Sequence, residues 1–315
     1  MVDLHMARSD LLNNYRLFVT VGHSEYWSKE MRDNVEQFVK NGGNAAFFSG
    51  NTCFWQVRIE DDGNTLVCYK DLFPYYPYLD PVFPSNVCTV NWNAYPVCRP
   101  STTLTGVSWS GSGPSDNQYI VENADHWVFE GVTSNGNSIK KGDRFGSWLD
   151  DPNIGPGSAL GEVDHRTEGD MGRTHDLSDD CTNHGVQEEE TDFHKLAIMQ
   201  DSSRGEAVTM GIFFNGLGTV FTASIFNWTR GLSQNGSWGP IDQITLNVLN
   251  HLQLELTITV PNVFGLDQER ASAKVKAAGL VPIFTNSGSV VWSQKPSAGS
   301  IVIPDSSVTM SLKPF

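Results

Sequence analysis

An apolar run, a glycine turn, a helical pattern and a second apolar run follow one another within the first fifty residues. Leu17–Val21 is typical of a buried strand, and Ser28–Lys40 carries apolar residues at helical spacing with Ser28 as its N-cap. Asn41–Gly43 supplies a helix-ending glycine signal, and Asn44–Phe48 is the next buried strand. A strand–helix–strand unit of this kind implies a parallel crossover, so we predict an α/β fold with a parallel sheet.

The turn after the first strand is rich in side chains that can bind metal or move protons. The segment Gly22–Ser28 presents His23, Glu25 and Tyr26 together, and Asn51 follows the second strand in the same way. Parallel α/β sheets build their sites at the carboxyl ends of strands, which favours a functional site here. A polar turn that only caps the following helix is the alternative, because turns are commonly polar.

Composition narrows the class of protein and of partner. The 315 residues suggest two domains, and nine Trp and seventeen Phe are enough for a real core. No apolar run approaches the ~20 residues of a membrane span, and the N-terminus has no secretory pattern. The net charge of −15 disfavours nucleic acid as a partner, whereas a small neutral or cationic substrate or a metal ion is compatible.

Cysteine usage predicts the compartment. The five cysteines are an odd number and contain no C-x-x-C pair. This pattern argues against a disulfide scaffold and a zinc knuckle, and it favours a reducing, cytoplasmic location.

The rest of the chain divides into an irregular middle, a regular end and an appended module. Residues 60–120 hold seven prolines and many aromatic residues, which predicts an irregular insertion or lid, and Gly131–Asp192 is loop-rich. Regular structure returns with a hairpin of Ala207–Phe214 and Thr219–Ile225 and a helix over Asp242–Leu252. We therefore expect one domain over residues 1–256 and a β-α-β-β module over 257–315, with a strand at 260–264 and a helix at about 267–278.

Several long blocks of the first domain resemble one enzyme family. They are Val19–Ser28, Gly42–Arg58, Cys68–Lys70, Asp125–Phe129, Gly161–Asp164 and Val220–Trp228. In this order they are similar to the C-terminal part of the large (beta) subunit of N,N-dimethylformamidase and its relatives. The resemblance covers roughly residues 3 to 253.

The resemblance implies a fold and a chemistry. The family's domain is a flavodoxin-like, class I glutamine amidotransferase-like sheet, and it hydrolyses small N-substituted amides at a mononuclear Fe(III) held by two tyrosines and one glutamate. Its glutamate corresponds to Glu25, its metal-side histidine to His23, its polar pocket residue to Asn51 and a second acidic residue to Glu162. Trivalent iron with hard oxygen ligands suits this reaction, because amides are poor electrophiles.

The chain departs from the family pattern at the tyrosine ligands. In the family both tyrosines precede the glutamate motif by a long stretch, whereas only Tyr15 precedes Glu25 here. Tyr26 and Tyr69 are substitutes to be tested. A fragment, a reduced homologue and a site completed by a second subunit or by a homo-oligomer all remain open, as does a non-catalytic cell-wall- or carbohydrate-binding protein built on a degenerate enzyme domain.

The C-terminal module resembles a PASTA domain. The resemblance rests on Val260–Val263, Ala278–Leu280 and above all on Gln294–Gly299, which carries a Gln-x-Pro-x-x-Gly pattern. Such domains occur in bacterial cell-wall enzymes and kinases, which implies a spacer or docking role or the binding of a cell-wall peptide.

Two other constellations compete with the Glu25 site. Cys53 follows Asn51 at a strand end and can be read as a nucleophile with His23 as its base. Four histidines stand in or near an acidic, loop-rich stretch without a recognised ligand spacing, which favours solvated loops over a metal site; they are His165, His175, His184 and His194.

Overall fold

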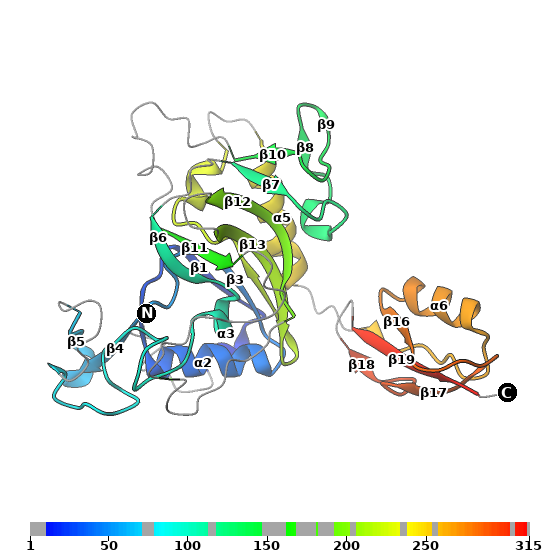
Figure 1. Ribbon diagram of the computed structural model, residues 1–315, viewed down its shortest axis with the longest axis horizontal. Helices are drawn as coiled ribbons and strands as arrows, with labels where there is room; N and C mark the ends of the chain where they lie inside the picture. Colours follow the sequence, from blue (N-terminus) through cyan, green and yellow to red (C-terminus); the bar gives the residue numbers. More distant parts are fainter. Residues whose placement is uncertain are drawn as a thin grey trace. The chain divides into compact units, whose positions relative to one another are not determined.

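The computed structural model describes residues 11–70, 79–112, 118–146, 162–167, 181, 192–201, 206–233, 238–253, 258–302 and 306–313. The chain divides into two compact units, Met1–Gln253 and Leu254–Phe315 (Figure 1), close to the division at 256/257 expected from the sequence. Within the described residues, no helix is both long and apolar enough to cross a membrane.

The predicted strand–helix–strand unit is present. Strand β1 (Leu17–His23) and strand β3 (Asn44–Gly50) pair in parallel, and α2 (Lys29–Lys40) connects them. Ser28 is the N-cap of α2, because its hydroxyl accepts a hydrogen bond from the Met31 amide at 3.2 Å. This cap fixes where the turn after β1 ends, and so it fixes the length of the segment that carries His23 and Glu25.

The main sheet is mixed, with the order β1-β3-β14-β13-β12-β7-β10 and with β11 and β6 attached through β13. Its further strands are β6 (Ser108–Ser112), β7 (Tyr119–Val121), β10 (Arg144–Phe145), β11 (Glu162–Thr167), β12 (His194–Asp201), β13 (Glu206–Asn215) and β14 (Gly218–Thr222). The parallel arrangement is limited to β1, β3 and β14; the pairings from β14 through β13 and β12 to β7 and β10 are antiparallel.

The expected parallel sheet is therefore wrong beyond its first three strands. The predicted hairpin of β13 and β14 is confirmed. Its tight turn makes the two strands antiparallel, since parallel neighbours need a long crossover connection between them. The α/β class holds in the coarser sense of a mixed, strand-rich α/β unit, and the flavodoxin-like topology stays a prediction.

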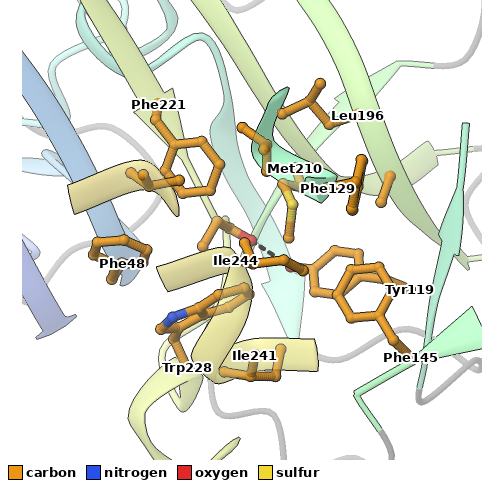
Figure 2. Close-up of a cluster of buried hydrophobic side chains, with 14 of the residues drawn as sticks. Phe48, Tyr119, Phe129, Phe145, Leu196, Met210, Phe221, Trp228, Ile241 and Ile244 are labelled. Carbon is orange, nitrogen blue, oxygen red and sulfur yellow. Dashed lines mark hydrogen bonds between the residues drawn. The ribbon is translucent and has the colours of Figure 1, made fainter. Parts of the chain in front are cut away.

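Two hydrophobic clusters cover the two faces of β3. Ala46 and Phe48 belong to one cluster together with α5 (Pro240–Gln253), and Ala45 and Phe47 belong to the other together with α2. A strand that is covered on both faces reads as a continuous apolar run, which explains why residues 44–48 were recognisable. Figure 2 shows the α5-side cluster, where Trp228 stacks on Phe48 with ring centroids 5.6 Å apart.

The insertion after β3 is built from short elements. Strand β2 (Tyr26–Ser28) pairs in parallel with β4 (Trp55–Glu60), and β4 pairs with β5 (Thr65–Val67) through the turn η2 (Asp61–Gly63). The other short elements of the first unit, Met1–Gln253, are η1 (Leu11–Asn14), α3 (Thr102–Thr105), η4 (Trp127–Phe129), β8 (Thr133–Ser134), β9 (Asn137–Ser138) and η6 (Trp228–Gly231).

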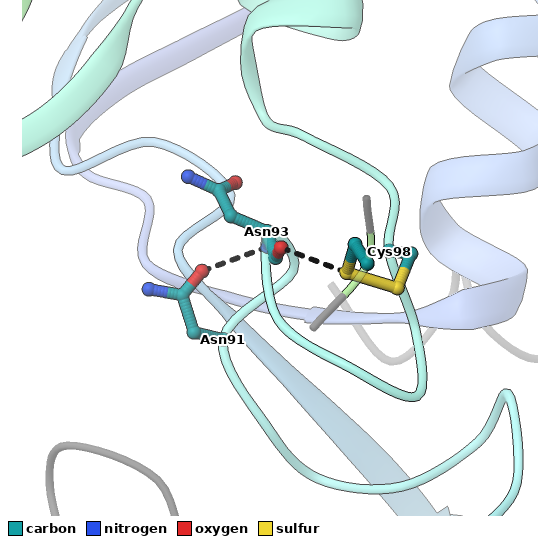
Figure 3. Close-up of a disulfide and its surroundings, with 4 residues drawn as sticks. Asn91, Asn93 and Cys98 are labelled. Atoms are coloured by element: carbon teal, nitrogen blue, oxygen red, sulfur yellow. Dashed lines mark hydrogen bonds between the residues drawn. A yellow bond between two sulfur atoms is a disulfide. The ribbon is translucent and has the colours of Figure 1, made fainter. Parts of the chain in front are cut away.

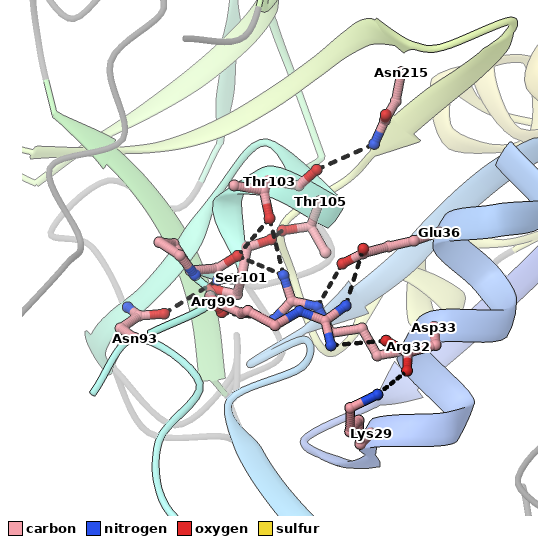
Figure 4. Close-up of polar contacts among 11 residues, drawn as sticks. Lys29, Arg32, Asp33, Glu36, Asn93, Arg99, Ser101, Thr103, Thr105 and Asn215 are labelled. Carbon is pink, nitrogen blue, oxygen red and sulfur yellow. Dashed lines mark hydrogen bonds and ion pairs between the residues drawn. The ribbon is translucent and has the colours of Figure 1, made fainter. Parts of the chain in front are cut away.

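A buried arginine fastens this insertion to α2. Arg32 is fully buried and donates to the carbonyl oxygens of Arg99 and Pro100, both at 2.7 Å, and to Glu36 at 2.7 Å (Figure 4). Arg99 pairs in turn with Asp33 at 2.7 Å and Glu36 at 3.0 Å. Because a buried guanidinium needs several acceptors, this network holds residues 99–100 of the insertion against α2.

A disulfide joins Cys98 to Cys181 across 83 residues (Figure 3). The cysteine pattern, which argued against a disulfide scaffold, did not predict this pair, since an odd total does not prevent one pair from forming. Cys53, Cys68 and Cys88 are free thiols. Structural disulfides are typical of oxidising compartments. The cytoplasmic location predicted from the cysteine pattern stays a prediction.

The C-terminal unit is a small α+β module. It contains β15 (Ile258–Thr259), α6 (Gln268–Ala277), β16 (Val281–Phe284), β17 (Val291–Lys295), β18 (Ile301–Val302) and β19 (Ser307–Leu312). Helix α6 agrees with the prediction, but the first strand is shorter and lies earlier than residues 260–264. Gln294 explains this difference: its side chain accepts from the Val263 amide at 2.9 Å and donates to the Pro261 carbonyl at 3.0 Å, which holds 261–263 as a loop.

Candidate functional site

The carboxyl ends of the three parallel strands meet at one edge of the sheet. His23 ends β1 and Glu25 follows it, Asn51 follows β3, and Ser224 follows β14. The segment after β3 is hydrogen-bonded to the segment after β1: the Cys53 amide donates to the Ser24 carbonyl at 2.8 Å, and the Phe54 and Trp55 amides donate to that of Glu25 at 3.0 Å. The sequence argument that these turns lie together is therefore correct in its geometry.

Glu25 is the centre of a polar cluster. Its side chain is 8% exposed; Oε2 lies 3.3 Å from Nε2 of His23, and Oε1 lies 3.8 Å from Nζ of Lys70. His23 is more open to solvent, with 37% of its side chain exposed. A nearly buried carboxylate is thus flanked by a group that can exchange protons and by a fixed positive charge.

Aromatic rings surround this cluster. The His23 ring packs edge-on against Phe226, with centroids 5.4 Å apart, and against Tyr26 at 6.5 Å. Lys70 lies over the Tyr26 ring and donates a hydrogen bond to its hydroxyl. Burial raises the pKa of Tyr26, and the hydrogen bond to Tyr26 raises the pKa of Lys70. The site therefore combines an apolar wall with one carboxylate, one imidazole and one ammonium group.

Asn51 is the first residue after β3. It is 2% exposed and adopts a left-handed backbone conformation with φ of 50°. Next to it, buried hydroxyls form a chain in which Thr20 and Ser49 are 2.8 Å apart and Ser49 and Thr52 are 3.0 Å apart. These bonds connect β1 to β3 and to the segment that follows β3.

The acidic residue that the structure brings to the strand ends is Asp164. It is fully buried, and its Oδ2 accepts a hydrogen bond from the Thr52 amide at 3.3 Å. Glu162, the residue predicted from the resemblance, begins β11 two positions earlier, and its side chain lies outside the described residues. Sequence reasoning missed Asp164 because a carboxylate in an acidic, loop-rich stretch reads as solvated; its position in the matched block Gly161–Asp164 was the available signal.

Lys70 was also missed as a site residue. It stands in the matched block Cys68–Lys70, but nothing local indicates that its ammonium group returns to Glu25. Tyr69, the neighbouring tyrosine, is 45% exposed.

The competing constellations fare differently. Cys53 is fully buried, and burial raises its pKa to about 12, which leaves no thiolate for a nucleophilic role at neutral pH. His194 lies in β12, and His165 lies in β11 with its side chain outside the described residues; His175 and His184 lie outside them altogether. In the part of the chain that the structure describes, no group of three or more His, Cys, Asp or Glu side chains is placed to hold a metal ion.

The ligand set of the implied iron is only partly present among the described residues. Glu25 is a suitable hard oxygen ligand. Tyr15 precedes β1, whereas Glu25 follows it, and a seven-residue strand separates such positions by roughly 20 Å. Tyr26 is close to Glu25, but Lys70 is bound to its hydroxyl. Glu25 therefore fits as one carboxylate ligand, whereas Tyr15 and Tyr26 do not fit the pair of tyrosinates.

Comparisons with known proteins agree with the two-part organisation. The family model described as N,N-dimethylformamidase beta subunit-like, C-terminal, matches residues 1–239, and the PASTA domain model matches residues 258–313. No curated protein matches the chain.

Among solved structures, the chain is similar to penicillin-binding protein 2X from Streptococcus thermophilus at 10% sequence identity. The match covers 40% of this chain and 22% of that chain, with a TM-score of 0.19, and it carries no argument about fold or function. The family models carry the assignment: this chain belongs to the N,N-dimethylformamidase beta subunit-like family, and a PASTA domain follows its family domain.

Proposed function

We propose that the site around Glu25 hydrolyses a small N-substituted amide. The observation that carries the proposal is the nearly buried Glu25 carboxylate between His23 and Lys70 at the carboxyl ends of parallel strands. The aromatic wall of Phe226 and Tyr26 suits a small, uncharged substrate, and the family to which the chain belongs supports the same reaction class.

The residues of the site fit the proton transfers of amide hydrolysis. In the proposed reaction His23 takes a proton from the attacking water, and a carbon–oxygen bond forms at the amide carbonyl. Asn51 donates a hydrogen bond to the oxyanion that develops. The carbon–nitrogen bond then breaks, and the amine leaves with the proton that His23 or Glu162 delivers.

We propose Glu25 as the ligand that this chain contributes to an Fe(III) centre. When bound there, iron would supply a Lewis acid for the amide carbonyl. The two tyrosinates of the family's site would come from outside the described residues, from a second subunit, a second copy of this chain or further polypeptide.

Metal binding tests the proposal apart from turnover. We expect the purified protein, supplied with ferric iron and with the polypeptide that contributes the two tyrosinates, to bind about one iron per chain. It should then develop a visible tyrosinate-to-iron band. Glu25→Gln, which keeps the shape of the side chain, should lose the iron and the band. Glu130→Gln, at an exposed position, is the matched control and should retain both. Equal iron binding by wild type and Glu25→Gln would remove Glu25 as a ligand.

The PASTA domain has a separate role in this proposal, as a spacer or as a docking module for a cell-wall peptide. It is a compact unit with its own core of apolar residues, among them Val263, Val275 and Met310. A chain without residues 257–315 should therefore keep its amide turnover, and binding to purified peptidoglycan should disappear with the module. A large loss of turnover in the shortened chain would contradict the separation of roles.

A further inference from the structure

Asp164 connects two turns of the site from a third strand. Its Oδ2 accepts the Thr52 amide at 3.3 Å, after the end of β3, and its own amide donates to the Ser224 carbonyl at 3.0 Å, after the end of β14. The residue itself lies in β11, which pairs with β13 and β6. One fully buried residue therefore binds both the segment after β3 and the segment after β14.

Both turns are in a conformation that L-residues rarely adopt. Asn51 has φ of 50° and Ser224 has φ of 63°, and each is buried. Left-handed backbone at a non-glycine residue is unfavourable and persists only where the surroundings determine it, and such residues concentrate at functional sites. Cys53, with φ of 56°, is a third residue of this kind within the same turn.

A buried carboxylate is expensive in free energy unless it is hydrogen-bonded, which makes a purely incidental position improbable. Burial raises the pKa of Tyr119 well above its usual value, and the negative charge of the neighbouring Asp164 raises it further. The Tyr119 hydroxyl donates to the carbonyl of Ala223, the residue before Ser224. Asp164 and Tyr119 thus hold two consecutive carbonyl groups at the end of β14.

We propose that Asp164 is the positioning residue of the site, which holds the left-handed turns at Asn51 and Ser224 so that Asn51 stays at the strand ends beside Glu25. It acts through the Thr52 amide and does not itself touch the substrate. The inference rests on the proposed function for its effect on catalysis, but the effect on the turns is measurable without a substrate.

The test compares Asp164→Ala and Asp164→Asn with the control Asp80→Asn. Asp80 is also a buried carboxylate, 1% exposed, but it lies in the insertion and binds Arg58 and Thr89. Asn at position 164 retains an oxygen that can accept the Thr52 amide, whereas Ala does not. The first readout is hydrogen–deuterium exchange of the peptide that contains Thr52, in the full chain.

We expect exchange at Thr52 to be about tenfold faster in Asp164→Ala, as for the loss of one buried hydrogen bond, and to be largely restored in Asp164→Asn. Asp80→Asn should lower the melting temperature without affecting exchange at Thr52. Unchanged exchange in Asp164→Ala, or the same increase in Asp80→Asn, would overturn the proposal. Should Asp164→Ala fail to fold, the exchange in Asp164→Asn decides alone: a rate above tenfold that of wild type would overturn it.

The second readout is amide turnover. We expect Asp164→Ala to lower kcat by about 10- to 100-fold with KM changed less than about threefold, because Asn51 acts on the transition state. A loss confined to KM would overturn the positioning role. If wild type hydrolyses no amide, the proposed function fails, while the exchange measurement still decides whether Asp164 holds the turns.

Discussion

Nε2 of His23 lies 3.3 Å from Oε2 of Glu25, and the opposite carboxylate oxygen lies 3.8 Å from Nζ of Lys70. The Glu25 side chain is therefore held between an imidazole and an ammonium group. It is 8% exposed, whereas the side chains of His23 and Lys70 are 37% and 45% exposed. Lys70 reaches it from the insertion that follows β3.

Replacing Lys70 should change the affinity of the site for metal. In Lys70→Met the ammonium is lost while most of the side-chain length remains, so a metal ion no longer competes with it for Glu25. We expect metal affinity to rise about tenfold, as for the loss of one partly screened charge, measured by calorimetric titration with ferric iron in a soluble chelate. Lys140→Met, at an exposed position, is the control and should bind as wild type does. Weaker binding by Lys70→Met would mean that the ammonium supports the metal site and does not compete with it.

His126 should make the stability of the first unit depend on pH. Burial, followed by the nearby His194 and His251, lowers its pKa to about 4, whereas an unfolded histidine titrates near 6.5. Between these values the unfolded chain binds more protons than the folded one, so stability falls as pH drops from about 6.5 to about 4. Oδ1 of Asp192 lies 3.5 Å from Nε2 of His194, which is one of the two histidines that lower the pKa of His126.

The matched variant is His126→Asn. The Nδ1 atom of His126 accepts from the Val128 amide at 3.3 Å as the N-cap of η4, and an Asn side chain can replace it there. Between pH 7 and pH 4.5 we expect the melting temperature of this variant to fall by at least about 3 °C less than that of wild type. Parallel curves for the two proteins would show that another group causes the acid sensitivity.

The disulfide should contribute to stability through the unfolded state. Cys98 and Cys181 are 83 positions apart in the sequence, for which the chain-entropy model gives roughly 4–5 kcal/mol. The double variant Cys98→Ser/Cys181→Ser should therefore unfold at a lower denaturant concentration than wild type, and dithiothreitol should destabilise only the wild type. Cys88→Ser, which leaves the disulfide intact, is the control for loss of a buried thiol. Equal unfolding midpoints with and without reductant would contradict a stabilising role.

The elements that were predictable from sequence are those with strong local signals. Helix α2 has its Ser28 cap, the β13–β14 hairpin has its Asn215–Gly218 turn, and β3 is a continuous apolar run because both of its faces are covered. From these it followed that the segments after β1 and β3, which carry Glu25 and Asn51, lie at one edge of the sheet, since carboxyl ends of parallel strands lie there.

What remained hidden depends on contacts between distant residues. Strand β7 has only three residues, so no periodicity announces that it joins the sheet beside β12. The partner of Cys98 is 83 residues away, and the position of Asp164 depends on β11 pairing with β13 and β6, beside the segments that follow β3 and β14. Lys70 likewise reaches Glu25 only because the insertion folds back over β2.

The most direct test of the central claim is the release of amine from small N-substituted amides, beginning with N,N-dimethylformamide. Wild type, supplied with ferric iron and with the polypeptide that completes the site, should release dimethylamine above the uncatalysed rate; under the same conditions Glu25→Gln should fall to background, and Glu130→Gln should match wild type at equal concentrations of folded protein. Release by Glu25→Gln at the wild-type rate, or no release from any amide by an iron-loaded wild type, would contradict an amide-hydrolysing site centred on Glu25.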